Sequence, residues 1–246
     1  MMLEVLILIL FAPLFGGLSI AVMQYCQCRK FFNPIQPYLD IWHCLTSKGE
    51  VSKWNPNGAI SLAAAILAIF ILFNVNFNLD FIVFISFILI SILFSQKYSD
   101  LNLKTEICNI LSFIWVMSTL YIYSQNSVFE TLLTLYSENI FPALLLFLIF
   151  IFLGVNMLTF DKLDFKKDVD SAFLYYSQLL CFNSLLSLSV LIVGNDSVWK
   201  FAGIFLAVAC AAGIVKFLGH KFPNLSCVVI FLLSLFFGIL ALSSAI

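Results

Sequence analysis

The stretch Ile140-Phe-Pro-Ala-Leu-Leu-Leu-Phe-Leu-Ile-Phe-Ile-Phe-Leu-Gly-Val-Asn-Met-Leu158 contains no charged side chain. Its length is close to the roughly 20 apolar residues that a helix needs to cross the hydrocarbon core of a bilayer. In lipid, the backbone N–H and C=O groups of such a segment must be satisfied internally, so we expect it to be helical. The stretch therefore predicts a helical membrane protein.

Seven further apolar segments are distributed along the 246 residues, of which 63% are hydrophobic and 10% charged. Soluble domains have about 25% charged residues. We expect an all-α fold, a polytopic membrane helix bundle of about eight transmembrane helices in a single transmembrane domain over residues 1–246. The first segment lacks a preceding basic residue and a small-residue cleavage site, so we interpret it as a mature span. The other predicted spans are residues 2–24, 57–76, 79–95, 107–124, 172–194, 199–218 and 224–245.

The longest polar connection is a loop at about residues 25–56, between the first and second segments. Three prolines punctuate this loop. Within it, Tyr38–Leu45 predicts a short helix on the membrane surface, and the connection 125–139 is a second interfacial candidate.

Lysine and arginine are distributed very unevenly between the two faces that eight spans would define. Eleven of them fall on one face and only Lys200 on the other. Basic loops stay in the cytoplasm, so we expect both termini on the non-cytoplasmic side of a multi-pass protein of the cell's inner (cytoplasmic) membrane. The eleven are Arg29, Lys30, Lys48, Lys53, Lys97, Lys104, Lys162, Lys166, Lys167, Lys216 and Lys221.

Few ionisable side chains fall at the predicted spans, although a proton or ion path needs such groups at depth. Glu4, Glu106 and Lys216 lie near span ends, where we expect interfacial positions, with the Lys216 side chain snorkelling to the surface. A relay role for these three is the alternative. We expect His43 and His220 to be solvated in cytoplasmic loops.

Seven cysteines are present, and no Cys-x-x-Cys pair occurs among them. Such a distribution does not predict an iron–sulfur or zinc site. Most of the cysteines fall in apolar segments, so we expect buried thiols.

Several polar residues occur inside the segment 172–194. Their spacing predicts one helix face that forms hydrogen bonds with neighbouring helices, with a quinone or lipid contact as the alternative. They are Asn183, Ser184, Ser187 and Ser189. No nucleophile elbow, phosphate-binding glycine loop or catalytic dyad is recognisable, so these patterns predict a membrane class and a topology but no activity.

The loop after the first segment contains the order Gln-x-Arg, then Gln-Pro-x-x-Asp. It resembles the same loop in the complex I subunit 1 family, which includes membrane subunits of energy-converting NiFe hydrogenases and of formate hydrogenlyase. Three positions depart from the family pattern, because Phe31-Phe32 replaces Gly-Pro and His43 replaces a lysine. The matching residues are Gln27, Arg29, Gln36, Pro37 and Asp40.

A second resemblance lies between the last two segments. Lys216, Lys221 and Pro223 match the family's Lys-Met-Arg-x-x-Arg-x-Pro segment, while Leu218 replaces the first arginine. The order and spacing of the matches, and the eight predicted spans, agree with the family over most of the chain.

A third match follows the fifth segment, where Asp161 and Asp168 are similar to two acidic positions of the family and are candidate relay residues. The family also has acidic residues beside its quinone cavity. The corresponding positions here are Gly154, Leu174 and Leu179, which cannot titrate. The resemblance therefore implies an inherited fold without that part of the proton path.

The resemblance implies a non-catalytic membrane anchor and coupling subunit of a multi-subunit oxidoreductase, of hydrogenase or NADH-quinone type. Its cytoplasmic side would dock the peripheral electron-transfer arm and other membrane subunits. Iron–sulfur clusters and NiFe or flavin would belong to partner subunits, with room for a quinone, and nucleic acid is not an expected partner. The implied docking residues are Gln27, Arg29, Gln36, Pro37, Asp40, Lys216 and Lys221.

Two other functions remain open from the sequence. A standalone transporter or lipid-handling protein would need a polar site at the membrane midplane, often at a broken helix. Gly203 and Gly213 are candidate positions for such a break. A purely structural assembly subunit is the third interpretation.

Overall fold

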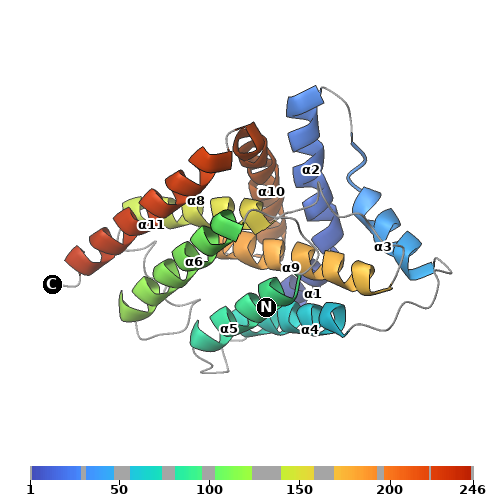
Figure 1. Cartoon of the computed structure of the whole chain (residues 1–246), viewed down its shortest axis with the longest axis horizontal. Coiled ribbons are helices and arrows are strands. Elements are labelled where there is room, and N and C mark those ends of the chain that lie inside the picture. The colour runs from blue at the N-terminus through green and yellow to red at the C-terminus, as the bar shows by residue number, and fades with distance from the viewer. Residues whose placement is uncertain are drawn as a thin grey trace.

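The predicted all-α fold is confirmed by a computed structural model, in which ten helices are described (Figure 1). The structure describes residues 2–28, 32–46, 56–73, 81–95, 103–123, 140–157, 169–192, 197–221 and 223–244, and this part of the chain contains no strand. The helices are α1 (Met2–Leu10), α2 (Ala12–Cys28), α3 (Gln36–Thr46), α4 (Asn57–Phe73), α5 (Phe81–Ser95), α6 (Leu103–Tyr123), α8 (Ile140–Met157), α9 (Val169–Ile192), α10 (Val198–Lys221) and α11 (Pro223–Ser244).

Helix α9 is the centre of the assembly, and α4 and α8 pack most extensively against it. Helices α2, α3, α5 and α10 also contact it, so nearly all of its side chains are buried. Its apolar residues are spread around the whole helix rather than along one stripe, as expected for a helix buried on all sides. Its serines and amides are therefore enclosed by protein.

The other helices pack in pairs around this centre. Helices α4 and α5 lie side by side, as do α6 and α11, while α8 packs between α9 and the α10–α11 pair (Figure 1). On the remaining side, α2 and α10 run next to each other and α3 follows beyond α2.

Small residues allow the close packing of α2 and α10. A Cβ at Gly213 would collide with the carbonyl oxygen of Ser19 and lie 2.7 Å from Cβ of Val22. The hydroxyl of Ser19 donates a hydrogen bond of 2.7 Å to the carbonyl oxygen of Ala209. Small side chains at such contacts let helix backbones approach closely in membrane proteins.

Two helices, α9 and α10, are long and apolar enough to cross a membrane, and the bent pair α1–α2 makes a third if it forms one span. Shorter apolar helices lie in α4, α5, α6, α8 and α11 within the described residues. Each of the eight predicted segments thus corresponds to a helix or, for the first, to a pair of helices.

The first segment is bent rather than straight, because α1 and α2 meet at an angle of 54° around Phe11. Helix α10, in contrast, has no break. It is continuous through Gly203 and Gly213, so the prediction of a break at these glycines is wrong. It also extends to Lys221, and therefore His220 lies in a helix rather than in a loop, whereas Lys216 lies in the helix as predicted.

The expectations for His43 and for the cysteines have different outcomes. His43 is exposed in the last turn of α3, within the predicted short helix, so the expectation for this residue needs no correction. Among the six cysteines that the structure describes, Cys44 and Cys181 are buried, whereas Cys26 and Cys28 are exposed at the end of α2. The expectation of buried thiols therefore holds for only some of them, because the apolar run ends before the last turn of α2.

Candidate functional site

The break between α1 and α2 follows from the position of Pro13. In an unbroken helix the carbonyl oxygen of Ile9 would accept a hydrogen bond from the backbone nitrogen of residue 13, but proline has no N–H. Helical bonds continue on both sides, from Phe11 N to the Ile7 carbonyl (2.9 Å) and from Phe15 N to the Phe11 carbonyl (3.0 Å). The last turn of α1 is therefore left with carbonyl groups that need other donors.

Three side chains from distant parts of the chain supply these donors to three consecutive carbonyls. Tyr38 of α3 donates to the carbonyl of Leu10 at 2.7 Å. Tyr176 of α9 donates to the carbonyl of Ile9, and Asn183 Nδ2 donates to that of Leu8 at 3.4 Å. We define these three carbonyls and three side chains as the break site.

Only one of the two polar atoms of the Asn183 side chain forms a hydrogen bond at the break site. The residue is completely buried, and the structure gives its Oδ1 no hydrogen-bond partner. A buried amide oxygen without a donor is costly, and most such groups in proteins are satisfied.

The phenol of Tyr38 stays protonated in this environment. Burial raises the pKa of Tyr38 above its usual value, and a backbone hydrogen bond from Leu14 opposes this effect. The hydroxyl group therefore keeps its proton at neutral pH and can act as the donor to α1.

Helix α3 is fixed at its start by local hydrogen bonds. The Asn33 side chain accepts from the backbone N–H of Ile35 at 3.1 Å, and the Asn33 carbonyl accepts from the N–H of Gln36 at 2.9 Å. Gln36 Nε2 then donates to Asp40 Oδ1 at 2.8 Å, one helical turn further on. Two of the predicted docking residues thus pair with each other.

The start of α3 packs directly on Gly17 of α2, and we call this contact the seat of α3. A Cβ at Gly17 would collide with the carbonyl oxygen of Pro34 and lie 3.0 Å from Cδ of Pro37. Pro37 is buried, so this predicted docking residue is a packing residue that attaches α3 to α2.

The outer face of α3 exposes large apolar side chains, among them Trp42 with 67% of its surface accessible. The helix is predicted as a surface helix over Tyr38–Leu45, and the observed helix begins two residues earlier. The exposed apolar residues are Ile35, Leu39, Trp42 and Leu45.

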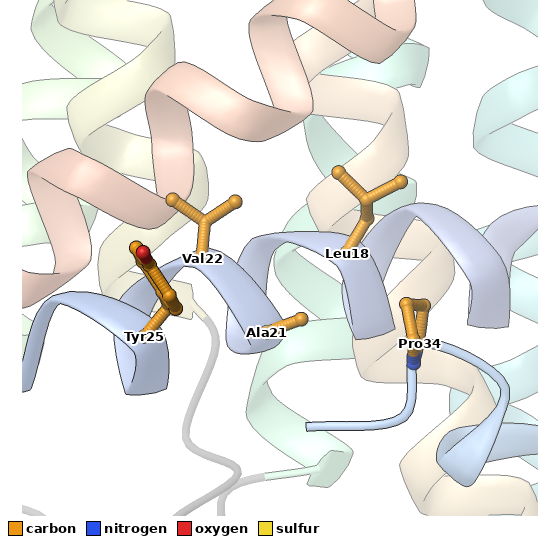
Figure 2. A pocket seen from close by; sticks show the side chains of 5 residues that line it. All are labelled: Leu18, Ala21, Val22, Tyr25 and Pro34. Carbon is orange, nitrogen blue, oxygen red and sulfur yellow. The ribbon is translucent and has the colours of Figure 1, made fainter. Parts of the chain in front are cut away.

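A pocket of about 280 Å³ lies beside α2, and its wall is apolar (Figure 2). Four of its lining residues come from α2, and Pro34 comes from the chain that leads into α3. Such a surface suits a hydrocarbon chain rather than a charged ligand. The lining residues are Leu18, Ala21, Val22, Tyr25 and Pro34.

The predicted docking residues do not form one cluster. Gln27 is exposed in the last turn of α2, while Lys216 and Lys221 lie on α10. Helix α2 lies between α10 and α3, so it separates the two lysines from Gln36 and Asp40 (Figure 1). Arg29, the candidate relay residues Asp161 and Asp168, and the loop 125–139 lie outside the described residues.

Three positions lack the acidic residues that the resembled family has, and apolar side chains surround them. Leu174 and Leu179 are buried in α9, and Gly154 faces Phe182 and Leu186. Of the interfacial candidates, Glu4 lies in the first turn of α1, whereas Lys216 is almost fully buried, contrary to the expected position at the surface.

The polar residues of α9 form hydrogen bonds as predicted, though only some reach other helices. Asn183 bonds to α1, and Ser189 donates to the Phe147 carbonyl of α8 at 3.5 Å. Ser184 and Ser187 instead donate to carbonyls of their own helix. Residues three or four apart on a helix often bond in this local way.

Two polar connections at α4 were not predicted from the sequence. Asp170 Oδ1 of α9 accepts from the backbone N–H of Gly58 at 2.8 Å, in the first turn of α4. Ser61 of α4 donates to the Ser91 carbonyl of α5 at 2.9 Å and bonds to Ser177 of α9 at 2.7 Å. The only sequence signal was the presence of serines in three apolar segments.

Comparison with known proteins adds no family assignment. No protein-family model matches this chain, and no curated protein matches it.

Proposed function

We propose that this chain is a polytopic membrane protein that anchors a multi-subunit oxidoreductase and docks its peripheral electron-transfer arm. The proposal includes about eight spans, with both termini on the non-cytoplasmic side of the cytoplasmic membrane. It is supported by the helices at all eight apolar segments and by the concentration of lysine and arginine between alternate segments. The sequence resemblance to the complex I subunit 1 family supplies the class of partner.

The fixed surface helix α3 is the observation on which the docking role rests. Its start is held by the Gln36–Asp40 hydrogen bond and by the seat of Pro37 on Gly17, while its outer apolar face remains exposed. A rigid element that presents exposed aromatic and apolar side chains suits a protein partner. Asp40 keeps a second carboxylate oxygen for a charged partner group, and the sequence resemblance adds the forked donor of Arg29 to the docking residues.

The redox groups of such a complex would belong to its partners, as iron–sulfur clusters with NiFe or flavin. The apolar pocket beside α2 would accept the tail of a quinone or a lipid. The absence of carboxylates at Gly154, Leu174 and Leu179 means that coupling would not use a carboxylate relay at these positions.

Purification of the tagged chain from its own membranes in mild detergent tests the proposal. We expect iron-containing subunits, and nickel or flavin, to be recovered with it. Recovery of a homogeneous chain without metal-containing partners would refute the docking role.

A matched pair of lysines in α10 tests which side docks. Lys221 and Lys200 are both exposed and lie at opposite ends of this helix. We expect Lys221→Ala to reduce recovery of the peripheral arm and Lys200→Ala to leave it unchanged. Equal recovery with both variants would contradict the proposed cytoplasmic docking side.

The break site favours a second candidate function, a standalone transporter. Discontinuous helices with side-chain-bonded carbonyls form the substrate or ion sites of many transporters. This function predicts a stable homomeric protein and solute uptake into vesicles that contain the chain alone. Vesicles that take up no solute, together with recovery of redox partners, would exclude it.

The third interpretation, a purely structural assembly subunit, is separated by the combined substitution of Arg29 and Asp40 with alanine. If the complex assembles but its turnover falls, the loop takes part in coupling. If assembly and turnover both remain unchanged, the docking assignment of these residues is wrong.

A further inference from the structure

The break site contains more acceptors than donors. Each backbone carbonyl oxygen has two lone pairs, and one hydrogen bond occupies only one of them. The carbonyls of Leu8, Ile9 and Leu10 each receive one side-chain donor, which leaves each with acceptor capacity. Asn183 Oδ1 adds a fully buried oxygen for which the structure gives no donor at all.

The orientation of the Asn183 amide follows from its contact with α1. Nδ2 donates to the Leu8 carbonyl, so Oδ1 is the atom left without a partner. Turning the amide over would place two acceptors against each other, and this would be unfavourable without a positively charged or donor group between them. The Oδ1 atom and the second lone pairs of the carbonyls therefore remain available as acceptors.

The electrostatics at the end of α1 favour a positive ligand. The C-terminal end of a helix has a partial negative charge, produced by its unpaired carbonyl groups. Unwound carbonyls and half-helix C-termini coordinate Na⁺ in membrane transporters, where irregular backbone borders a cavity. An amide oxygen and backbone carbonyls are also the hard oxygen ligands that small cations prefer.

We propose that the break between α1 and α2 binds a monovalent cation of the Na⁺ class, through Asn183 Oδ1 and carbonyl oxygens of the last turn of α1. Tyr38 of α3 is one of the donors at this site, but cation binding there does not depend on the proposed docking role of the outer face of α3. Tyr38 and Tyr176 hold the carbonyls in place from two other helices, so the site is assembled only in the folded chain.

Ligand-dependent stability measures this binding directly on the full chain in detergent. A ligand that binds only the folded state raises the melting temperature according to its concentration relative to Kd. At Na⁺ about fivefold above Kd, we expect Tm to rise by about 2–4 °C over choline chloride of the same ionic strength. KCl in the same series shows whether the ion radius matters.

Asn183→Leu is expected to abolish the difference between NaCl and choline chloride. The matched control is Asn156→Leu in α8, because Asn156 also donates from Nδ2, to Asn109 Oδ1 at 3.0 Å. The control loses a similar amide but should retain the Na⁺-dependent rise. An ion-dependent rise that survives in Asn183→Leu, or that disappears in both variants, would overturn the proposal.

Asn183→Asp provides a second test that does not depend on recovering the leucine variant. A carboxylate at this position adds a formal negative charge next to the cation, so half of the Na⁺-dependent shift should be reached at a lower Na⁺ concentration. A wild-type Tm that is the same in all three salts would refute cation binding. These outcomes are independent of partner recovery, so they do not test the docking role.

Discussion

Replacing Gly17 by alanine should displace α3 from its seat on α2. The added Cβ would collide with the Pro34 carbonyl oxygen, would lie 2.9 Å from its carbonyl carbon, and would lie 3.0 Å from Cδ of Pro37. Two of these three atoms belong to the backbone, and the third belongs to a closed ring. None is the end of a flexible side chain, so the chain before α3 must move.

The size of the effect follows from two opposing terms. Alanine is favoured over glycine inside a helix by about 1 kcal/mol. Overpacking of a close contact costs about 1–3 kcal/mol, and a backbone collision falls at the upper end of this range. We therefore expect Gly17→Ala to lower the free energy of unfolding by about 2 kcal/mol.

Gly203→Ala is the matched control, because Gly203 is also in a helix interior and a Cβ there would meet no atom within 4 Å. Only the helix term remains, so this variant should be more stable by about 0.5–1 kcal/mol. Unfolding in mixed micelles of mild detergent and dodecyl sulfate measures both values.

Alkylation of Cys44 reports the displacement of α3 itself. This thiol is buried on the inner side of α3, whereas Cys26 and Cys28 are exposed and must first be replaced. Gly17→Ala should accelerate labelling of Cys44, and Gly203→Ala should leave the rate unchanged. Stability and labelling equal to wild type in Gly17→Ala would refute the assigned seat.

Three further substitutions test individual hydrogen bonds, the first two by the same unfolding assay and the third by hydrogen exchange. Asp170→Ala removes the acceptor for Gly58 N–H at the start of α4 and should cost about 1–3 kcal/mol, while Asp170→Asn, which retains an acceptor, should cost less; equal losses would argue against this bond. Ser61→Ala, which removes the bond to the Ser91 carbonyl, should cost about 0.6–1.7 kcal/mol, and no loss would show that the bond adds nothing in detergent. Tyr38→Phe leaves a carbonyl of α1 without its donor and should speed hydrogen exchange at the break, whereas unchanged exchange would mean that the hydroxyl does not stabilise it.

Helix positions could be predicted from the sequence because long apolar runs have one outcome in lipid, where backbone groups must pair within the segment. The bend between α1 and α2 in the first segment could not be predicted in this way. Pro13 was visible as a helix-disrupting residue, but prolines are tolerated in membrane helices when neighbours satisfy the freed carbonyls. Those neighbours are Tyr38 and Tyr176, which lie 28 and 167 positions away from the carbonyls that they bind.

Gly213 and Asp170 show the same limit of prediction from the sequence. Gly213 was a candidate break, yet it serves close packing against Ser19, because a helix glycine has either role depending on its partner helix. Asp170 was not predicted as functional, since its role at the start of α4 depends on Gly58, which is 112 positions away. Local pattern identifies such residues, and tertiary contact decides what they do.

The enclosure of α9 bears on how the proposed membrane protein would be inserted during synthesis. Helix α9 is less apolar than α10, because its serines, glutamine and asparagine face other helices instead of lipid. If α9 entered lipid alone, these groups would be exposed to hydrocarbon until protein partners arrived. Of its neighbours, α4, α5 and α8 are synthesised earlier and only α10 follows it. Ribosome-bound chains truncated soon after α9 should therefore insert this helix when α4, α5 and α8 precede it, and insert it poorly when α9 is the first helix of the chain.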